Sequence, residues 1–197
     1  MQDPRTRNAS RSEVVSLIGA RCSGKTSAGR ELARRLGWTF VDLDQEIARA
    51  DAAARETEEI GPAGSVLARL GEPAFRDLES RALAEILDRP GPFVLATGGG
   101  VVEREENRKL LARRTTCVWL RVAPSEMQRR LRADPAPRPA LEPGGDPVEE
   151  LPRIAERRAH AYAETCELQI DCRGLRIGEV ARRIAERIGR GRPGTCG

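Results

Sequence analysis

The sequence predicts an α/β fold in which helices pack around one parallel sheet. Two observations predict it. Short apolar runs alternate with longer stretches of helical periodicity, and a glycine-rich phosphate-loop pattern links the first run to the first helix. The length of 197 residues suits one domain with a well-developed core.

The strands are expected in five apolar runs of four to six residues. These runs are residues 14–18, 38–43, 93–96, 117–122 and 168–171. Each is followed by at least one stretch of helical periodicity, and strands joined through helices run parallel. The helices are expected at residues 25–36, 45–54, 72–88, 103–113, 125–132, 147–164 and 178–188.

Two segments interrupt this alternation. Residues 55–64 (RETEEIGPAG) are polar, end near Gly-Pro and are expected to form a loop between helices. Residues 133–147 contain five prolines and two glycines. A connection of that length is usually functional or disordered. Because it carries Arg138, we interpret it as an active-site lid.

The charge composition argues against a nucleic-acid partner. The net charge is +4, but the arginines alternate with acidic residues along the expected helices, as on solvated, ion-paired faces. Aromatic residues make up only 3% of the chain, which leaves few rings to stack on bases. The excess positive charge favours an anionic small molecule.

Neither a structural zinc site nor a membrane segment is expected. The five cysteines form no C-x-x-C pair, and His160 is the single histidine, so a structural zinc site is not predicted. No apolar run approaches the roughly 20 residues that cross a bilayer. The first residues lack the apolar core of a secretory signal, and we expect a cytoplasmic protein with reduced thiols.

The segment from Gly19 to Thr26 (GARCSGKT) has the spacing of a phosphate-binding loop. Its backbone N–H groups and the following helix N-terminus are expected to hold the phosphates of a nucleotide. Lys25 would supply positive charge, and the hydroxyl of Thr26 would bind Mg²⁺. The pattern predicts the phosphoryl donor and leaves the acceptor open.

Acidic side chains follow the second expected strand. Asp42 and Asp44 alternate at its end, where α/β enzymes bind ligands. One could hold the metal through water, and the other could accept a proton from a substrate hydroxyl. The alternative is an ordinary strand-to-helix loop in which an aspartate caps the helix.

Three further segments supply candidate acceptor-binding groups. Arg76 and Arg158 lie on different expected helices and could bind one carboxylate in bidentate geometry. The alternative for each arginine is a surface ion pair. Gly98, Gly99 and Gly100 follow a buried strand. Three consecutive glycines are costly in backbone entropy, which indicates close approach of the backbone to a ligand.

In order and spacing, these segments resemble the shikimate kinases from about residue 14 to residue 188. The matching series is GARCSGKT, DLDQEI, GEPAFRDLE, ATGGGVV, RPAL and RRAHAYAE. The resemblance implies a three-layer P-loop kinase fold of the nucleoside-monophosphate-kinase type, with a five-stranded parallel sheet in the order 2-3-1-4-5. It also implies a lid (about 133–147) and a substrate-binding helical insert (about 44–80).

Position by position, the resemblance implies the following roles. The ATP-binding residues would be Cys22, Ser23, Gly24, Lys25, Thr26, Ser27 and the lid residue Arg138. Thr26 and Asp42 would bind the metal ion. The catalytic residues would be Lys25, Asp44 and Arg138. The acceptor would be bound by Asp44, Arg76, Gly98, Gly99, Gly100 and Arg158. An arginine near the C-terminus, Arg173 or Arg176, would contact adenine.

The sequence departs from the family pattern at three places. Cys22 replaces a glycine of the loop, Ala159, His160 and Ala161 replace x-Pro-Leu in R-x-P-L-Y, and the stretch between Asp44 and Phe75 is longer.

The resulting prediction is Mg²⁺- and ATP-dependent phosphorylation of the 3-hydroxyl of shikimate, by one domain over residues 13–189 with flexible ends at 1–12 and 190–197. A monomer with no membrane partner is expected. Two alternatives stay open: a kinase of the same fold for gluconate or a nucleoside monophosphate, and a ligand sensor without catalysis.

Overall fold

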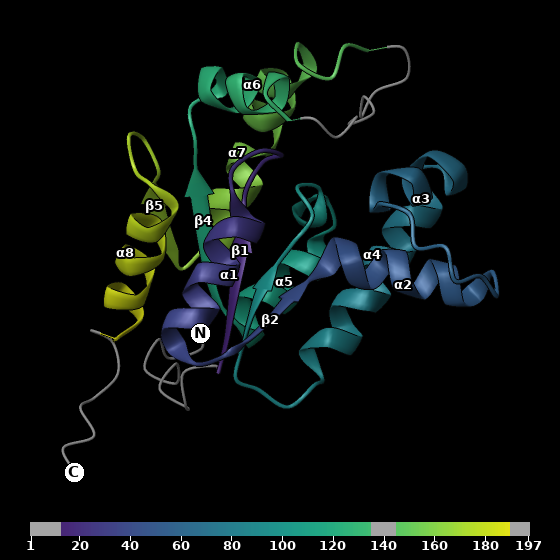
Figure 1. The fold of residues 1–197 in the computed structure, drawn as a ribbon, viewed down its shortest axis with the longest axis horizontal. Coiled ribbons are helices and arrows are strands. Elements are labelled where there is room, and N and C mark those ends of the chain that lie inside the picture. Colours follow the sequence, from purple (N-terminus) through teal and green to yellow (C-terminus); the bar gives the residue numbers. More distant parts are fainter. Residues whose placement is uncertain (1–12, 135–144, 190–197) are drawn as a thin grey trace, which may run out of the picture.

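A parallel sheet of five strands forms the centre of the computed structural model, which describes residues 13–134 and 145–189 (Figure 1). The strands are β1 (Val14–Ile18), β2 (Thr39–Asp42), β3 (Phe93–Ala96), β4 (Thr116–Arg121) and β5 (Leu168–Asp171). Their order is β2-β3-β1-β4-β5, and every neighbouring pair is parallel. The five strands and the strand order are therefore confirmed, with ends shifted by one residue or so.

The register brings the ends of three strands to one edge of the sheet. Ala96 of β3 is paired with Leu17 of β1 on one side and with Asp42 of β2 on the other. Because all strands run in the same direction, the segments that follow these residues leave the sheet side by side. They are the phosphate loop, the pair Asp42 and Asp44, and the glycine triplet 98–100.

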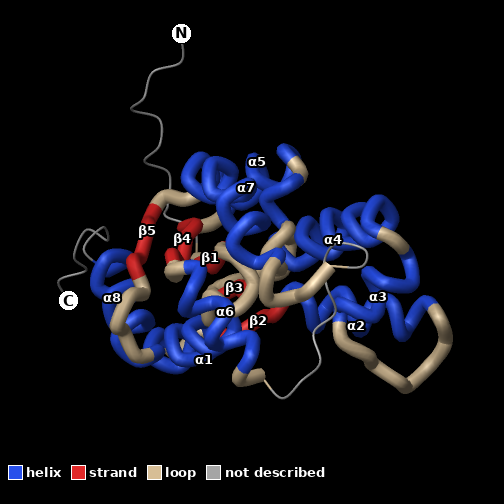
Figure 2. The backbone as a smooth tube through the Cα atoms, turned by 90° about the horizontal axis from the view of Figure 1, so that it is seen from above, coloured by secondary structure: helices blue, strands red, loops and turns tan. Residues whose placement is uncertain are grey.

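Helices cover both faces of the sheet (Figure 2). One face carries α1 (Lys25–Leu36) and α8 (Ile177–Gly189), and the other carries α4 (Glu72–Leu87), α5 (Glu105–Arg114) and α7 (Glu150–Thr165). Side chains alternate along each strand, so Leu17 packs toward α1 and α8 while Ile18 packs toward the opposite helices. A large buried core on each face of the sheet gives the three layers that were predicted.

A helix that was not expected from the sequence projects beside the sheet. Residues 55–64 were expected to be a loop, but α3 (Ala63–Leu70) begins directly after Pro62 and packs with α2 (Leu43–Ala54) and α4. Its apolar stripe of Val66, Leu67 and Leu70 contacts the core. Asp51 of α2 pairs with Arg69 of α3 and, at 2.9 Å, with Arg55. Gly-Pro here marks the start of a helix rather than the middle of a loop.

Some predicted helix boundaries were wrong for local reasons. The helix expected from residue 103 begins at Glu105, because Val101–Glu103 form a separate 3₁₀ turn, η2. The helix expected from residue 147 begins at Glu150. Asp146 Oδ1 accepts hydrogen bonds from the N–H groups of Val148 (2.7 Å) and Glu149 (3.0 Å), which forms a turn ahead of α7.

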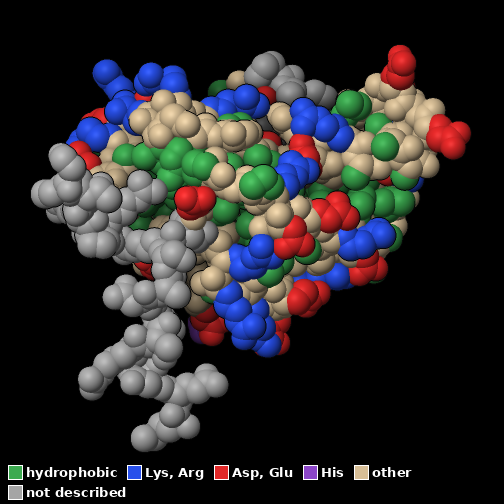
Figure 3. Space-filling model, turned by 90° about the horizontal axis from the view of Figure 1, so that it is seen from below, with side chains coloured by type: hydrophobic (Ala, Val, Ile, Leu, Met, Phe, Trp, Pro, Cys, Tyr) green, Lys and Arg blue, Asp and Glu red, His purple; other side chains and the backbone are tan. Residues whose placement is uncertain are grey.

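Charges of both signs are interspersed on the face in Figure 3, as the sequence pattern predicted. Many of these charges are paired within the same helix, such as Arg34 with Glu31 at 2.9 Å in α1 and Arg182 with Glu186 at 2.6 Å in α8. Within residues 13–134 and 145–189, no helix is both long and apolar enough to span a bilayer.

Candidate functional site

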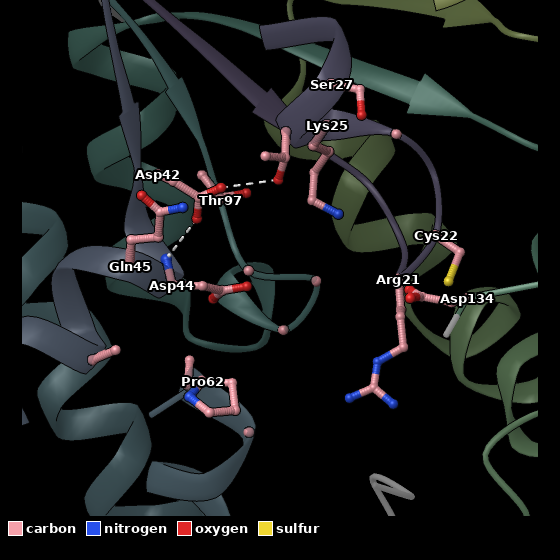
Figure 4. A pocket seen from close by; sticks show the side chains of 18 of the residues that line it. Arg21, Cys22, Lys25, Ser27, Asp42, Asp44, Gln45, Pro62, Thr97 and Asp134 are labelled. Carbon is pink, nitrogen blue, oxygen red and sulfur yellow. Dashed lines mark hydrogen bonds between the residues drawn. The ribbon is translucent and has the colours of Figure 1, made fainter. Parts of the chain in front are cut away.

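A cavity of about 1330 Å³ lies at the edge of the sheet where β1, β2 and β3 end (Figure 4). Its walls come from segments far apart in the sequence. They include most of the residues singled out above, namely Cys22, Gly24, Lys25, Thr26, Ser27, Asp42, Asp44, Arg76, Gly98, Gly99, Gly100 and Arg158. The structure thus brings nearly all the predicted donor and acceptor residues to one place. Arg138 lies outside the described residues, as does most of the expected lid.

The phosphate loop follows β1 and leads into α1. Gly19 and Gly24 have φ of 145° and 90°, conformations that L side chains rarely adopt. A Cβ at Gly19 would lie 2.8 Å from the carbonyl oxygen of Leu120, so the close approach also requires glycine. Gly24 caps α1, whose first N–H groups have no partner within the helix and suit an anion.

Cys22 is the unusual member of this loop. Its φ of 62° is left-handed, which favours glycine over any other residue. Its carbonyl oxygen accepts a hydrogen bond from Arg130 Nη1 at 3.2 Å, so α6 (Pro124–Arg132) contacts the loop. The cysteine therefore occupies a position whose backbone conformation would suit a glycine.

Lys25 is buried and bound to neutral oxygens. Its Nζ donates to the carbonyl oxygens of Gly19 (2.9 Å) and Ala20 (2.8 Å), with Ser23 Oγ at 3.4 Å. Burial lowers the pKa of Lys25 from 10.5 to about 8, against the opposing effect of Asp44 and Asp42. Since its hydrogen-bond partners are uncharged, Lys25 keeps its positive charge available for an anion in the cavity.

Asp42 joins the loop to the next strand. Its Oδ2 accepts from Thr26 Oγ1 at 2.9 Å, and its Oδ1 accepts from the N–H of Asp44 at 3.1 Å, which caps α2 (Figure 4). Asp42 is thus the N-cap of α2, and its other carboxylate oxygen contacts Thr26. Asp44, expected between a strand ending at residue 43 and a helix beginning at residue 45, lies in the first turn of α2, and its side chain lines the cavity.

The oxygen atoms of Thr26 and Asp42 are ligands that suit Mg²⁺. This ion usually takes one or two protein oxygens together with phosphate oxygens and water. Over the described ranges, the side chains of His, Cys, Asp and Glu form no group of three or more that could hold a metal ion. A hydroxyl and a carboxylate beside a phosphate loop fit a metal that arrives with a nucleotide.

The glycine triplet lies between the loop and the acceptor residues. A Cβ at Gly98 would be 2.9 Å from Asp44 Oδ1 and from Glu79 Oε1, and one at Gly100 would overlap the Arg76 guanidinium. The carbonyl oxygen of Gly99 accepts from Tyr162 Oη at 2.5 Å. The absence of side chains at Gly98 and Gly100 thus lets the side chains of Asp44, Glu79 and Arg76 lie against the backbone.

Arg76 and Arg158 are not surface ion pairs, since only 8% and 6% of their surfaces are exposed. Arg76 pairs with Glu79 at 2.8 Å, Glu72 at 3.3 Å and Glu103 at 3.0 Å. Arg158 Nε donates to Glu103 at 2.7 Å. Both arginines line the cavity from different helices. The Nε of Arg76 is buried and has no hydrogen-bond partner among the described residues.

Several lining residues were not predicted. Glu79 is buried, and burial raises its pKa despite the neighbouring Arg76. Its position three residues after Arg76 on one helix was the available signal. The side chain of Arg130 lies over the loop. Of the two arginines expected to contact adenine, Arg176 lines the cavity and Arg173 does not. Ile60 and Pro62, which precede α3, and Leu67 of α3 form an apolar wall of the cavity.

Comparisons with known proteins agree with this geometry. Residues 21–189 match the family model of shikimate kinase. The shikimate kinase of Caulobacter vibrioides is 44% identical over 155 residues, which cover 78% of this chain and 72% of that protein. The shikimate kinase of Paracidovorax citrulli is 38% identical over 176 residues, which cover 88% of this chain and 91% of the relative.

A solved structure has the same architecture. The shikimate kinase from Acinetobacter baumannii, in complex with shikimate, is 27% identical with a TM-score of 0.75, over 92% of this chain and 95% of that one.

Proposed function

The chain belongs to the shikimate kinase family, and from that membership we propose that it transfers the γ-phosphoryl group of ATP to the 3-hydroxyl of shikimate. The products are shikimate 3-phosphate and ADP, in the biosynthesis of aromatic amino acids. The observation that carries the proposal is a single cavity in which a phosphate loop, an aspartate and two buried arginines meet. Such a site can hold a phosphoryl donor against a small carboxylated acceptor.

We assign the donor end of the cavity to ATP. The N–H groups of residues 22–27 and the N-terminus of α1 would bind its phosphates, with Lys25 beside them. Thr26 and Asp42 would hold Mg²⁺. When bound, this ion neutralises phosphate charge during transfer. Arg138 as a lid residue rests on the family resemblance alone.

We assign the acceptor end to shikimate. Arg76 and Arg158 would bind its carboxylate, and guanidinium groups suit carboxylates because two N–H groups face two oxygens. Both arginines border the cavity although they are largely buried, which supports this role. Backbone groups of residues 98–100 would contact hydroxyls.

Asp44 would act as the general base. It lines the cavity between the phosphate loop and the arginines, within electrostatic range of Lys25. From there it would hydrogen-bond the attacking hydroxyl and accept its proton as the oxygen bonds to phosphorus. Because phosphoryl transfer needs little covalent assistance, positioning by Asp44 and charge neutralisation by Lys25 would provide most of the rate enhancement.

The test is an ADP-release assay in which shikimate, gluconate and a nucleoside monophosphate are supplied one at a time. We expect shikimate alone to raise ADP release above the rate with ATP and no acceptor. Faster release with gluconate or the monophosphate would favour a different acceptor for this fold. Release that no acceptor stimulates, with ATP still bound, would favour a ligand sensor.

A further inference from the structure

Glu103 connects the two arginines of the acceptor end. It is the last residue of η2, and its N–H donates to the carbonyl oxygen of Gly100 at 2.9 Å. Its two carboxylate oxygens are divided between the arginines. Oε1 accepts from Arg158 Nε at 2.7 Å and also contacts Arg158 Nη2, while Oε2 lies 3.0 Å from Arg76 Nη2.

The carboxylate of Glu103 approaches from behind the arginines. Arg76 and Arg158 line the large cavity, and in the described part of the chain Glu103 is not among its lining residues. Glu103 instead lines a second cavity of about 540 Å³, together with Glu72, Arg108 and Arg157. Arg158 borders both cavities, so it separates Glu103 from the space assigned to the acceptor.

The two arginines depend on Glu103 to different degrees. Arg76 also pairs with Glu79 at 2.8 Å and Glu72 at 3.3 Å. For Arg158, Glu103 is the one carboxylate within ion-pair distance among the residues that the structure describes. Burial by itself would raise the pKa of Glu103, but Arg158 and Arg76 outweigh it and keep the pKa below its ordinary value, so Glu103 is ionised at neutral pH.

We propose that Glu103 is a positioning residue that holds the Arg76 and Arg158 guanidinium groups from behind, oriented together toward the carboxylate of the acceptor. This inference rests on the proposed function, because it names what orients the carboxylate-binding pair. One carboxylate shared by two helices fixes the spacing between α4 and α7 at the point where a bidentate ligand must bridge them.

The test is Glu103→Gln, with shikimate and ATP varied separately. Glutamine keeps the size but has one acceptor oxygen, so its NH₂ group faces the donors of one arginine. We expect the KM for shikimate to rise roughly tenfold, the effect of one lost charge-assisted hydrogen bond. The KM for ATP and kcat should stay within about twofold, far less than that effect.

A neutral analogue and a matched variant separate positioning from general disruption. With the carboxamide of shikimate as acceptor, the KM of Glu103→Gln should equal that of the wild type, because this acceptor has no carboxylate for the arginines to bind. Glu106→Gln removes an acid three residues away that pairs with Arg104 at 3.5 Å, and we expect it to behave as wild type. Thermal unfolding of each variant checks that it is folded.

Three results would overturn the inference. An unchanged KM for shikimate would mean that Glu103 does not orient the arginines. A lower KM would mean that it competes with the acceptor carboxylate. If Glu103→Gln and the charge-preserving Glu103→Asp both lose ATP binding, or both fail to fold, the role of Glu103 is purely structural. A wild type that does not phosphorylate shikimate would instead refute the proposed function.

Discussion

The two ends of the cavity are built in different ways. The donor end comes mainly from one continuous segment, residues 19–27, which leaves β1 and enters α1. The acceptor end draws its lining residues from α2, α4, α7 and the glycine triplet. Local chain geometry therefore determines the first end, whereas the second exists only when distant helices pack together.

Charge is also handled differently at the two ends. Lys25 is hydrogen-bonded to carbonyl oxygens and a hydroxyl, so its charge is not neutralised before a ligand arrives. Arg76 and Arg158 are already paired with carboxylates. The comparison indicates that net charge attracts the phosphates, whereas orientation of donors selects the acceptor.

The sharpest way to separate the two ends is Asp44→Asn. The change keeps the size but removes the charge that accepts the hydroxyl proton, so we expect kcat to fall by about 10²–10⁴-fold. The dissociation constant of ATP should be nearly unchanged, as measured by isothermal titration. Glu46→Gln, on the same helix but outside the cavity lining, is the control. A rate within about twofold of wild type, far short of that range, would exclude Asp44 as the base.

Arg158→Lys tests whether orientation matters more than charge at the acceptor end. Lysine keeps the charge but loses the planar fork, so the KM for shikimate should rise by about ten- to a hundredfold. ATP affinity without shikimate should not change. Arg157→Lys changes the exposed neighbour and should have no effect. If both variants keep the wild-type KM, Arg158 does not bind the acceptor.

Gly100→Ala attacks the same end through the backbone. The added Cβ would lie 2.5 Å from Arg76 Cζ and would displace the guanidinium, which sits at the end of a flexible side chain. We expect the KM for shikimate to rise about tenfold, with little change in melting temperature. At Gly178 of α8 the nearest atom to a new Cβ is 3.6 Å away, so Gly178→Ala serves as the control. Equal kinetics for the two variants would contradict the close approach at Gly100.

The donor end should instead respond to pH. Below about pH 8, Lys25 is protonated in the free protein, and above it the proton is lost. Bound phosphates raise this pKa, so ATP binding must take up a proton at higher pH. We expect ATP affinity to fall by up to about tenfold per unit of pH above 8. Titration calorimetry at about pH 7 and about pH 9 measures it. Lys25→Arg should bind with a flat profile, and a flat wild-type profile would contradict the lowered pKa.

The smallest expected effect is at Cys22. Glycine relieves the left-handed backbone but gains entropy in the unfolded chain, so Cys22→Gly should change the unfolding free energy by less than about 1 kcal/mol. Its kcat should remain within about twofold, because no side-chain role in transfer is assigned to the cysteine. Cys22→Val places a β-branched residue at the same φ and should destabilise by about 1–2 kcal/mol in thermal unfolding. Equal unfolding free energies for the wild type, Cys22→Gly and Cys22→Val would show that the backbone at residue 22 is not strained.

The same contrast explains what could be predicted from the sequence. The phosphate loop and the strands were identified because their signals are local: glycine spacing, apolar runs and helical periodicity. α3 was missed because Gly61-Pro62 was interpreted as part of a loop, although the apolar spacing of Val66, Leu67 and Leu70 was visible. A short helix of this kind is stabilised by packing on its neighbours more than by its own sequence.

The acceptor residues were predicted individually, but their pairing was not. Nothing local indicates that Glu103 reaches both Arg76 and Arg158, which lie 27 and 55 residues away and meet it only in the folded chain. Of the three acids paired with Arg76, Glu72 and Glu79 have helical spacing from it. In so arginine-rich a chain, that spacing is common on exposed faces and does not by itself indicate a site.

The most direct test of the proposed function is a competition followed by product identification. Wild-type protein is given MgATP with equal concentrations of shikimate, gluconate and a nucleoside monophosphate, and the products are resolved by ³¹P and ¹H NMR. The proposed function predicts one phosphate ester, on the 3-hydroxyl of shikimate. A dominant signal from phosphogluconate or from a nucleoside diphosphate formed from the monophosphate, or a phosphate on another shikimate hydroxyl, would contradict it.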